Sequence, residues 1–146
     1  MSMSNAAEQA LLDLLLLNTD WANVGDAAGL QNSATAGSFY IALHTADPGE
    51  AGSQTTNEAA YTSYARVAVA RSAGGWTRTG SSIANTALVQ FPQCTGSSST
   101  ITHFSVGTDS SGAGQIIVSG ALSSSLAVST GIQPQFAAGE ISTTAD

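Results

Sequence analysis

The chain has 146 residues with ten carboxylates and three basic side chains, so its formal net charge is −7 at pH 7. A chain this acidic lacks the cationic cluster that binds a phosphate backbone, which excludes nucleic acid as an expected partner, and its single cysteine excludes a disulfide framework or a zinc ribbon. Its length predicts one domain with a real core, and 42% apolar residues with only 9% charged ones argue against a disordered chain.

The first predicted element is an α-helix that begins at Asn5 and ends near Leu17. Asn5 and Glu8 have the spacing of a capping box, and strong helix formers follow them. The apolar run 10–17 in this helix is interrupted by Asp13 and is shorter than the roughly 20 residues of a membrane span. It also lacks the basic flank of a signal peptide. We therefore expect no membrane partner.

The predicted helix carries leucines on more than one side. Leu11, Leu14 and Leu15 form one stripe at helical spacing, and further leucines widen it beyond a single surface. Such a helix either packs wholly on its own domain or docks part of its surface on a neighbouring subunit, and the sequence leaves both open. Leu11, Leu14, Leu15 and Trp21 are the candidate packing or partner-binding residues of this region.

From residue 37 the pattern changes to short alternating runs separated by Gly, Ser, Asp and Asn, which is typical of an all-β domain. Strands are predicted in or near 38–45, 64–71, 75–79, 87–91, 100–106, 115–122, 125–128 and 135–142. This number of strands predicts an all-β fold, either a jelly-roll or a two-sheet β-sandwich of about eight strands with one N-terminal α-helix. We expect one domain overall, with the helix and its connecting segment in 1–36 and the β body in 37–146.

A tight turn is predicted at "DPGE", residues 47–50. Pro48 fixes φ at the second position of a type II turn, and Gly49 permits the positive φ that the third position needs. The connection that follows, 49–60, has small side chains and no periodicity. Polar contacts or a partner must therefore hold this connection in place.

Three arginines are the basic residues of the chain, and two of them follow that connection closely. Strand periodicity predicts that Arg66 and Arg71 point to opposite faces, so each is expected to have its own role. A guanidinium can bind a carboxylate through two N–H groups, and Glu58 is one of the nearest candidates. Arg66 then holds the connection within its own subunit or binds an acidic surface of a partner. Arg78, which follows Trp76, is predicted to be a rim residue with its stem across an aromatic ring.

No pattern in the sequence predicts an enzyme. With His44 and His103 as the two histidines, pairings with the many serines are expected by chance and do not indicate a triad. Cys94 has no neighbouring cation and is interpreted as a packing residue. His44, Asp47 and Glu50 repeat at a spacing of three, but a turn interrupts them and they supply few oxygens, so no metal is predicted. We expect no catalytic residue and no cofactor.

Six segments of the chain resemble a family of small virion proteins of tailed bacteriophages. The segments are "YIALHTADPGEAG", "TNEAAYTSYARVAVAR", "GGWTRTG", "ITHFSVG", "GAGQIIVSGAL" and "IQPQFAAGEI". Members of this family are called tail-fibre-like, and some resemble capsid cement (decoration) proteins with a jelly-roll or sandwich body. The resemblance covers nearly the whole chain and implies a structural protein of the virion without transferring a catalytic residue.

Within that resemblance, the compact size favours a capsid cement protein, because a fibre usually includes a long shaft for which this chain has no room. The expected partners are the major capsid protein and further copies of the same chain, as a dimer or trimer. The expected location is the capsid surface of the virion, after assembly in the host cytoplasm. The alternative is a tail-associated fibre or adhesin protein that binds host surface glycan. A cell-wall hydrolase is the third possibility, but it lacks an acid/base pair.

Overall fold

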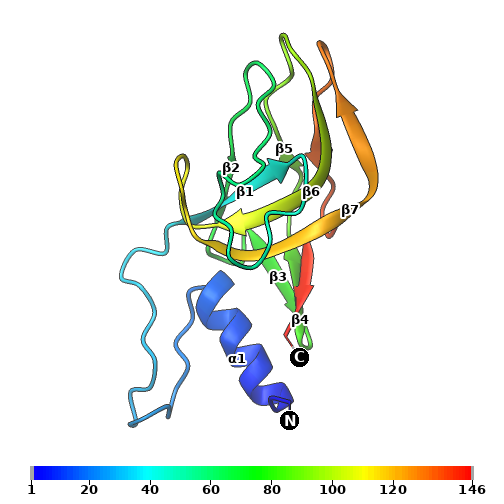
Figure 1. The fold of residues 1–146 in the computed structure, drawn as a ribbon. Coiled ribbons are helices and arrows are strands. Elements are labelled where there is room, and N and C mark those ends of the chain that lie inside the picture. The colour runs from blue at the N-terminus through cyan, green and yellow to red at the C-terminus, as the bar shows by residue number, and fades with distance from the viewer. Residues whose placement is uncertain (1, 146) are drawn as a thin grey trace. The chain divides into compact units, whose positions relative to one another are not determined.

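The computed structural model describes residues 2–145 and begins with the α-helix α1, Asn5–Leu16 (Figure 1). Ser4 is its N-cap, because the Ser4 backbone is extended and its hydroxyl oxygen accepts a hydrogen bond from the amide of Ala7 at 3.3 Å. The predicted helix is confirmed. The predicted cap at Asn5 is wrong by one residue, since Asn5 is the first residue of α1 and the Glu8 amide donates to the Ser4 carbonyl at 3.0 Å.

The most buried side of α1 differs from the predicted stripe. Glu8, Leu12 and Leu16 are buried, at a spacing of four that keeps them on one side of the helix. Leu11, Leu14 and Leu15 are half-buried instead. Strands β3 and β4 contact α1 within the same unit of the chain. None of the helix leucines is fully exposed, so the wide apolar surface is covered on several sides.

Nine strands follow α1 in the described residues, and they form three sheets. Their bounds are β1 Ser38–His44, β2 Val67–Ala70, β3 Trp76–Thr79, β4 Ser82–Asn85, β5 Val89–Gln90, β6 Ser99–Gly107, β7 Ile116–Val128, β8 Gln135–Phe136 and β9 Ser142–Thr144. The sheet orders are β2-β1-β6-β7, β3-β4-β9 and β5-β8, with antiparallel pairing of β1 to β6, β6 to β7, β3 to β4 and β4 to β9. The predicted fold class, all-β in the manner of a β-sandwich with one N-terminal helix, is confirmed.

The predicted strands differ from the observed ones in several places. The sequence pattern missed β4, which is a short strand joined to β3 by a tight turn in which Gly80 has a φ of 61°. The predicted strands 115–122 and 125–128 are one continuous strand, β7. The predicted strand 135–142 is divided into β8 and β9, because a turn that contains Gly139 at a φ of 84° separates them.

The predicted strand 64–71 is reduced to the four residues of β2. Ser63 has a φ of 81°, and the amide of Tyr64 donates to the carbonyl of Tyr61, so the chain turns before the strand begins. Arg66 and Arg71 therefore flank β2 and do not belong to it. Strand alternation therefore does not set their directions, but each arginine has its own set of partners, as expected.

The chain divides into two units, each assembled from separated parts of the sequence. Unit 1 comprises the described residues up to Ser38, Val69–Leu88 and the residues from Phe136 onward, and it contains α1, β3, β4 and β9. Unit 2 comprises Phe39–Ala68 and Val89–Gln135, and it contains β6, β7 and most of β1. The predicted division into 1–36 and 37–146 stays a prediction, and its outermost residues, Met1 and Asp146, lie outside the described residues.

Each unit has its own buried apolar residues. In unit 1 the set includes Leu12, Leu16, Trp76, Ile83 and Ile141. In unit 2 it includes Ile41, Leu43, Phe91, Ile101 and Val106. The first residues of β1 alternate in burial, but its last four residues are all buried, which shows that both faces of the strand are covered there. This burial of both faces brings the polar side chain of His44 into the interior of unit 2.

Candidate functional site

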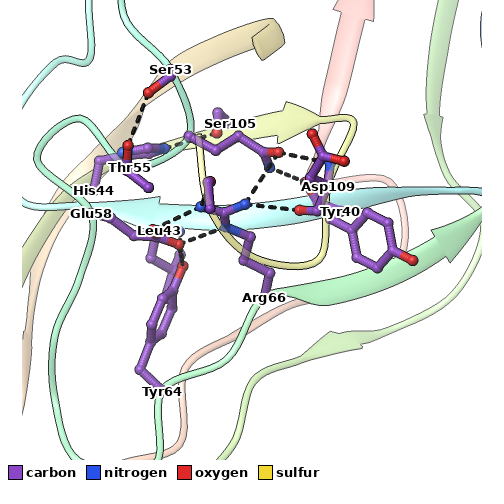
Figure 2. A network of polar contacts seen from close by, with 12 residues as sticks. Tyr40, Leu43, His44, Ser53, Thr55, Glu58, Tyr64, Arg66, Ser105 and Asp109 are labelled. Atoms are coloured by element: carbon purple, nitrogen blue, oxygen red, sulfur yellow. Dashed lines mark hydrogen bonds and ion pairs between the residues drawn. The ribbon is translucent and has the colours of Figure 1, made fainter. Parts of the chain in front are cut away.

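The most elaborate polar cluster of the described chain is centred on Arg66 in unit 2 (Figure 2). Its Nε donates to Glu58 Oε1 at 2.7 Å and its Nη2 donates to Glu58 Oε2 at 2.8 Å, which is the bidentate pairing that the sequence suggested. The Arg66 side chain is 2% exposed and that of Glu58 is 18% exposed. The hydrogen bond to Glu58 raises the pKa of Arg66, so the guanidinium stays charged in spite of burial.

The same guanidinium also holds a second loop. Arg66 Nη1 donates to the carbonyl of Asp109 at 2.8 Å, and Nη2 donates to the carbonyl of Gly112 at 2.7 Å. A longer contact of 3.4 Å joins Nη1 to Gln54 Oε1. Arg66 thus ties the connection around residue 58 and the loop around residue 110 to its own segment. Its charge is used within its own chain, so the structure gives no free Arg66 for an acidic partner.

Gln54 is a second hub that sequence reasoning missed. It is fully buried, and its amide donates to the Tyr40 carbonyl at 3.0 Å while its oxygen accepts from the Asp109 amide at 3.0 Å. A Cβ at Gly107 or at Gly114 would overlap the Gln54 side chain, so those two glycines make the space that it occupies. Nothing in the local sequence of the connection distinguishes Gln54 from a solvent-exposed loop residue.

Tyr64 covers the Arg66–Glu58 pair. Its hydroxyl donates to Glu58 Oε1 at 3.0 Å and accepts from the Leu43 amide at 3.0 Å, and burial raises its pKa. The ring of Tyr64 meets the ring of Tyr61 edge to face at 5.3 Å and stacks with that of Phe91 at 6.3 Å. The tyrosines of the 56–71 segment therefore act as aromatic packing with polar tips.

His44 and Ser105 form a histidine–serine pair inside unit 2. The Thr56 carbonyl lies 2.8 Å from His44 Nδ1 and can only accept, so Nδ1 carries the proton and Nε2 accepts from the Ser105 hydroxyl at 2.8 Å. Burial lowers the pKa of His44, which keeps the ring neutral. Both residues are 0% exposed. A nucleophile must meet its substrate, and this hydroxyl is sealed from solvent.

Arg71 has a comparable anchoring role in unit 1. Its Nε donates to the Leu15 carbonyl at 2.6 Å and its Nη2 donates to the Leu14 carbonyl at 2.8 Å, both in the last turn of α1. Its Nη1 donates to the Ala36 carbonyl at 3.1 Å and to the Ser33 hydroxyl at 3.3 Å. A cation at this end of a helix satisfies unpaired carbonyls and opposes the negative pole of the helix dipole.

Arg78 pairs with the helix as well. Its Nε lies 2.6 Å from Asp13 Oδ1, and its Nη1 donates to the Gly80 carbonyl at 3.1 Å. The guanidinium of Arg78 therefore contacts α1 through Asp13, and packing of its stem across an aromatic ring stays a prediction. Both side chains are partly exposed, at 28% and 21%.

The structure distributes the eight predicted site residues over both units. Glu58 and Arg66 lie together in unit 2, whereas Arg71, Arg78 and the helix leucines lie in unit 1. Trp21 is half-buried, and its backbone pairs with that of Leu30 through hydrogen bonds of 2.9 and 2.8 Å. A partner-binding role for these residues stays a prediction.

Other candidate groups in the described residues have ordinary surroundings. Cys94 is 1% exposed, and its thiol donates to the Gly96 carbonyl at 3.2 Å. The His103 ring lies 2.9 Å from the Thr102 hydroxyl. No cluster of three metal-ligating side chains occurs between residues 2 and 145. Over the same range, no helix has both the length and the apolar composition that crossing a membrane requires.

Comparison with known proteins gives a match over almost the whole chain. The model of a family described as "Podophage GP4 fiber I protein gp80" matches residues 2–144. A search of curated proteins gave no match. The family match identifies a structural, fibre-related protein of a bacteriophage virion, in agreement with the resemblance found in the sequence.

Proposed function

The chain belongs to the podophage GP4 fiber I protein gp80 family, and from this premise we propose that it is a subunit of a fibre on the phage virion. In this role it works through packing surfaces and carries no reactive centre. Its expected binding partners are further copies of the same chain and the virion protein to which the fibre is attached. Nucleic acid and membrane have no part in the proposal.

The observation that carries this proposal is that the clustered polar side chains of unit 2 bind groups of their own chain. Arg66, Glu58 and Gln54 bind one another and backbone groups of their own unit. The one histidine–serine pair with catalytic potential, His44 and Ser105, is fully buried. These clusters fasten long loops within unit 2. A body whose long loops are fastened from within suits a structural subunit.

The aromatic side chains favour an attachment role over sugar binding. Sugar sites commonly present an exposed ring, and none of the nine aromatic residues of this chain is exposed in the structure. We therefore place glycan recognition, if the fibre performs it, in another protein of the fibre. Isothermal titration calorimetry of the purified chain with host surface glycan is expected to give no heat of binding.

A second candidate is a capsid cement protein that binds the major capsid protein and stabilises contacts between capsomers at the capsid surface. It is favoured by the lack of a shaft, since the described chain has a 12-residue helix and a longest strand of 13 residues. If the chain is instead a fibre subunit, as proposed above, other proteins must supply the length of the appendage.

Cryo-electron microscopy of the intact virion distinguishes the two candidates. A fibre subunit is expected as density at an appendage, in copies that are a small multiple of the tail symmetry. Cement is expected as density repeated over the head, in copies that scale with the number of capsomers. Location on the head shell would overturn the first proposal. An enzymatic activity of this chain on a bound substrate would overturn both.

A further inference from the structure

The strand β7, Ile116–Val128, forms one edge of the four-stranded sheet and has an unusual composition for an edge. Its 13 residues include no charged residue and no proline. Natural proteins protect such edges with charges, prolines or short strands, because an unpaired edge is a template for another strand. Figure 1 shows β7 as a long, curved orange strand. Its composition leaves this edge open to pairing.

The centre of β7 is also the least covered part of the strand. The residues Ser123–Ala127 are all exposed, and Leu126 is 37% exposed. The register with β6 passes from Leu126–Ile101 directly to Ala121–His103, so the four residues 122–125 have no partner residue in β6. The strand bulges there, and its backbone lacks a regular neighbour on either side.

The sequence of this uncovered segment is a palindrome. Residues 121–127 read "ALSSSLA", which is the same in both directions about Ser124. Two antiparallel strands related by a two-fold axis place each residue opposite its mirror-image position. With the axis at Ser124, each leucine faces a leucine, each alanine faces an alanine and each serine faces a serine. Side chains that face each other across two strands interact, and hydroxyl pairs can form hydrogen bonds there.

We propose that a second copy of this chain pairs with β7 in antiparallel orientation, with the two-fold axis at Ser124. This inference deepens the self-association in the proposed function by naming the surface and its symmetry. The second copy is favoured over a different protein because the palindrome matches itself residue by residue. The absence of charge from β7 also keeps the repulsion between two chains of net charge −7 away from the contact.

The pairing involves a short segment, so the dimer is expected to depend on concentration. We expect such a contact to bury less than the roughly 1,200 Å² of a standard stable complex. Sedimentation velocity of the full chain should therefore show a monomer at low concentration and a dimer at high concentration. High local concentration on a virion favours the paired form.

Cysteine cross-linking tests the register directly. Facing residues of antiparallel strands have Cα atoms about 4.5–5.5 Å apart, which suits a disulfide. Under mild oxidation, Ser124→Cys is expected to form a covalent dimer, because Ser124 faces its own copy. Ser123→Cys should cross-link with Ser125→Cys in a mixture and only weakly with itself. The native Cys94 does not interfere, since it is 1% exposed.

Ser119→Cys is the matched control, because Ser119 is an exposed serine of the same strand. In the proposed dimer the two copies of residue 119 lie roughly 30 Å apart, at about 3.4 Å per residue, and cannot form a disulfide. Equal cross-linking at 119 and 124, or a monomer at every concentration, would overturn the inference.

A charge test uses the symmetry in a second way. Ser124→Lys and Ser124→Glu each place like charges opposite one another, so each variant alone should remain monomeric at concentrations where the parent chain dimerises. An equimolar mixture should restore a dimer, because the opposite charges then face each other. Assembly that persists in Ser124→Lys alone, or an odd-numbered assembly, contradicts the proposal. These solution results do not depend on where the protein lies on the virion.

Discussion

Arg66 in unit 2 and Arg71 in unit 1 perform the same task with different partners. Arg66 binds the two oxygens of one carboxylate and fastens two loops, and its side chain is 2% exposed. Arg71 donates to two carbonyls at the end of α1 and to the segment 33–36. The difference shows that an acidic chain can hold irregular segments with few cations, if each guanidinium serves several acceptors.

The largest effect is expected at Arg66. Arg66→Ala leaves the partly buried Glu58 carboxylate without its partner and releases both loops, so the free energy of unfolding should fall by about 3–5 kcal/mol. Urea unfolding followed by circular dichroism measures the loss. Arg66→Lys keeps the charge but loses the paired donors, and it should recover only part of the stability. A loss below about 1 kcal/mol in Arg66→Ala would mean that the loops are held by other contacts.

A smaller effect is expected at Arg71. Arg71→Ala exposes the Leu14 and Leu15 carbonyls at a helix end, where water can replace the lost donors, so the expected cost is about 1–2 kcal/mol. Native-state hydrogen exchange should show faster exchange of the α1 amides, while the β6 amides keep the rates of the parent chain. Uniform acceleration of both would show that the helix and the sheet unfold together.

Acid should weaken unit 2 selectively, since both histidines belong to it. Burial lowers the pKa of His44 below its ordinary value of 6.5, so the unfolded chain binds the proton more readily than the folded one. The contribution of His44 is complete above that value and is lost as the pH falls below it. His44→Gln should flatten this dependence between about pH 7 and 5, and His103→Gln is the matched control. An unchanged slope in His44→Gln would remove His44 as the cause.

The smallest effect is expected at Arg78. Its ion pair with Asp13 is partly exposed on both sides, at 28% and 21%, and pairs of this kind stabilise a protein by about 0.2–1 kcal/mol. Arg78→Ala should lower the free energy of unfolding by about 0.5 kcal/mol, with a loss that shrinks as salt is added. A cost as large as that at Arg71 would show that the pair has a larger role in holding α1.

The elements that could be predicted from sequence are those with a clear local pattern. The leucines and other helix formers of α1, and the β-branched and aromatic residues of β1, indicate their structures because these residue types recur in short, continuous runs. The pair of Glu58 and Arg66 was also predictable, since few charges are available and the two are close in sequence. The turn at Gly49 is consistent with its φ of 70°.

The remaining contacts could not be predicted, because their partners leave no local pattern. Gln54 depends on two glycines that clear space for its side chain from distant positions in the sequence. Two acceptors of Arg71 are backbone carbonyls more than 50 residues earlier, and every residue carries a carbonyl. The capping position was missed because Ser4 and Asn5 are both good caps and only the backbone geometry distinguishes them.

The scarcity of basic residues has a consequence for the durability of the protein outside a cell. A trypsin-like protease must seat an arginine or lysine side chain in its specificity pocket, and this chain offers three arginines and no lysine. Each of the three donates to acceptors of its own unit, so cleavage requires local unfolding first. Beyond Arg78 the chain has no further site, and the whole of β6 and β7 would remain intact in any tryptic digest.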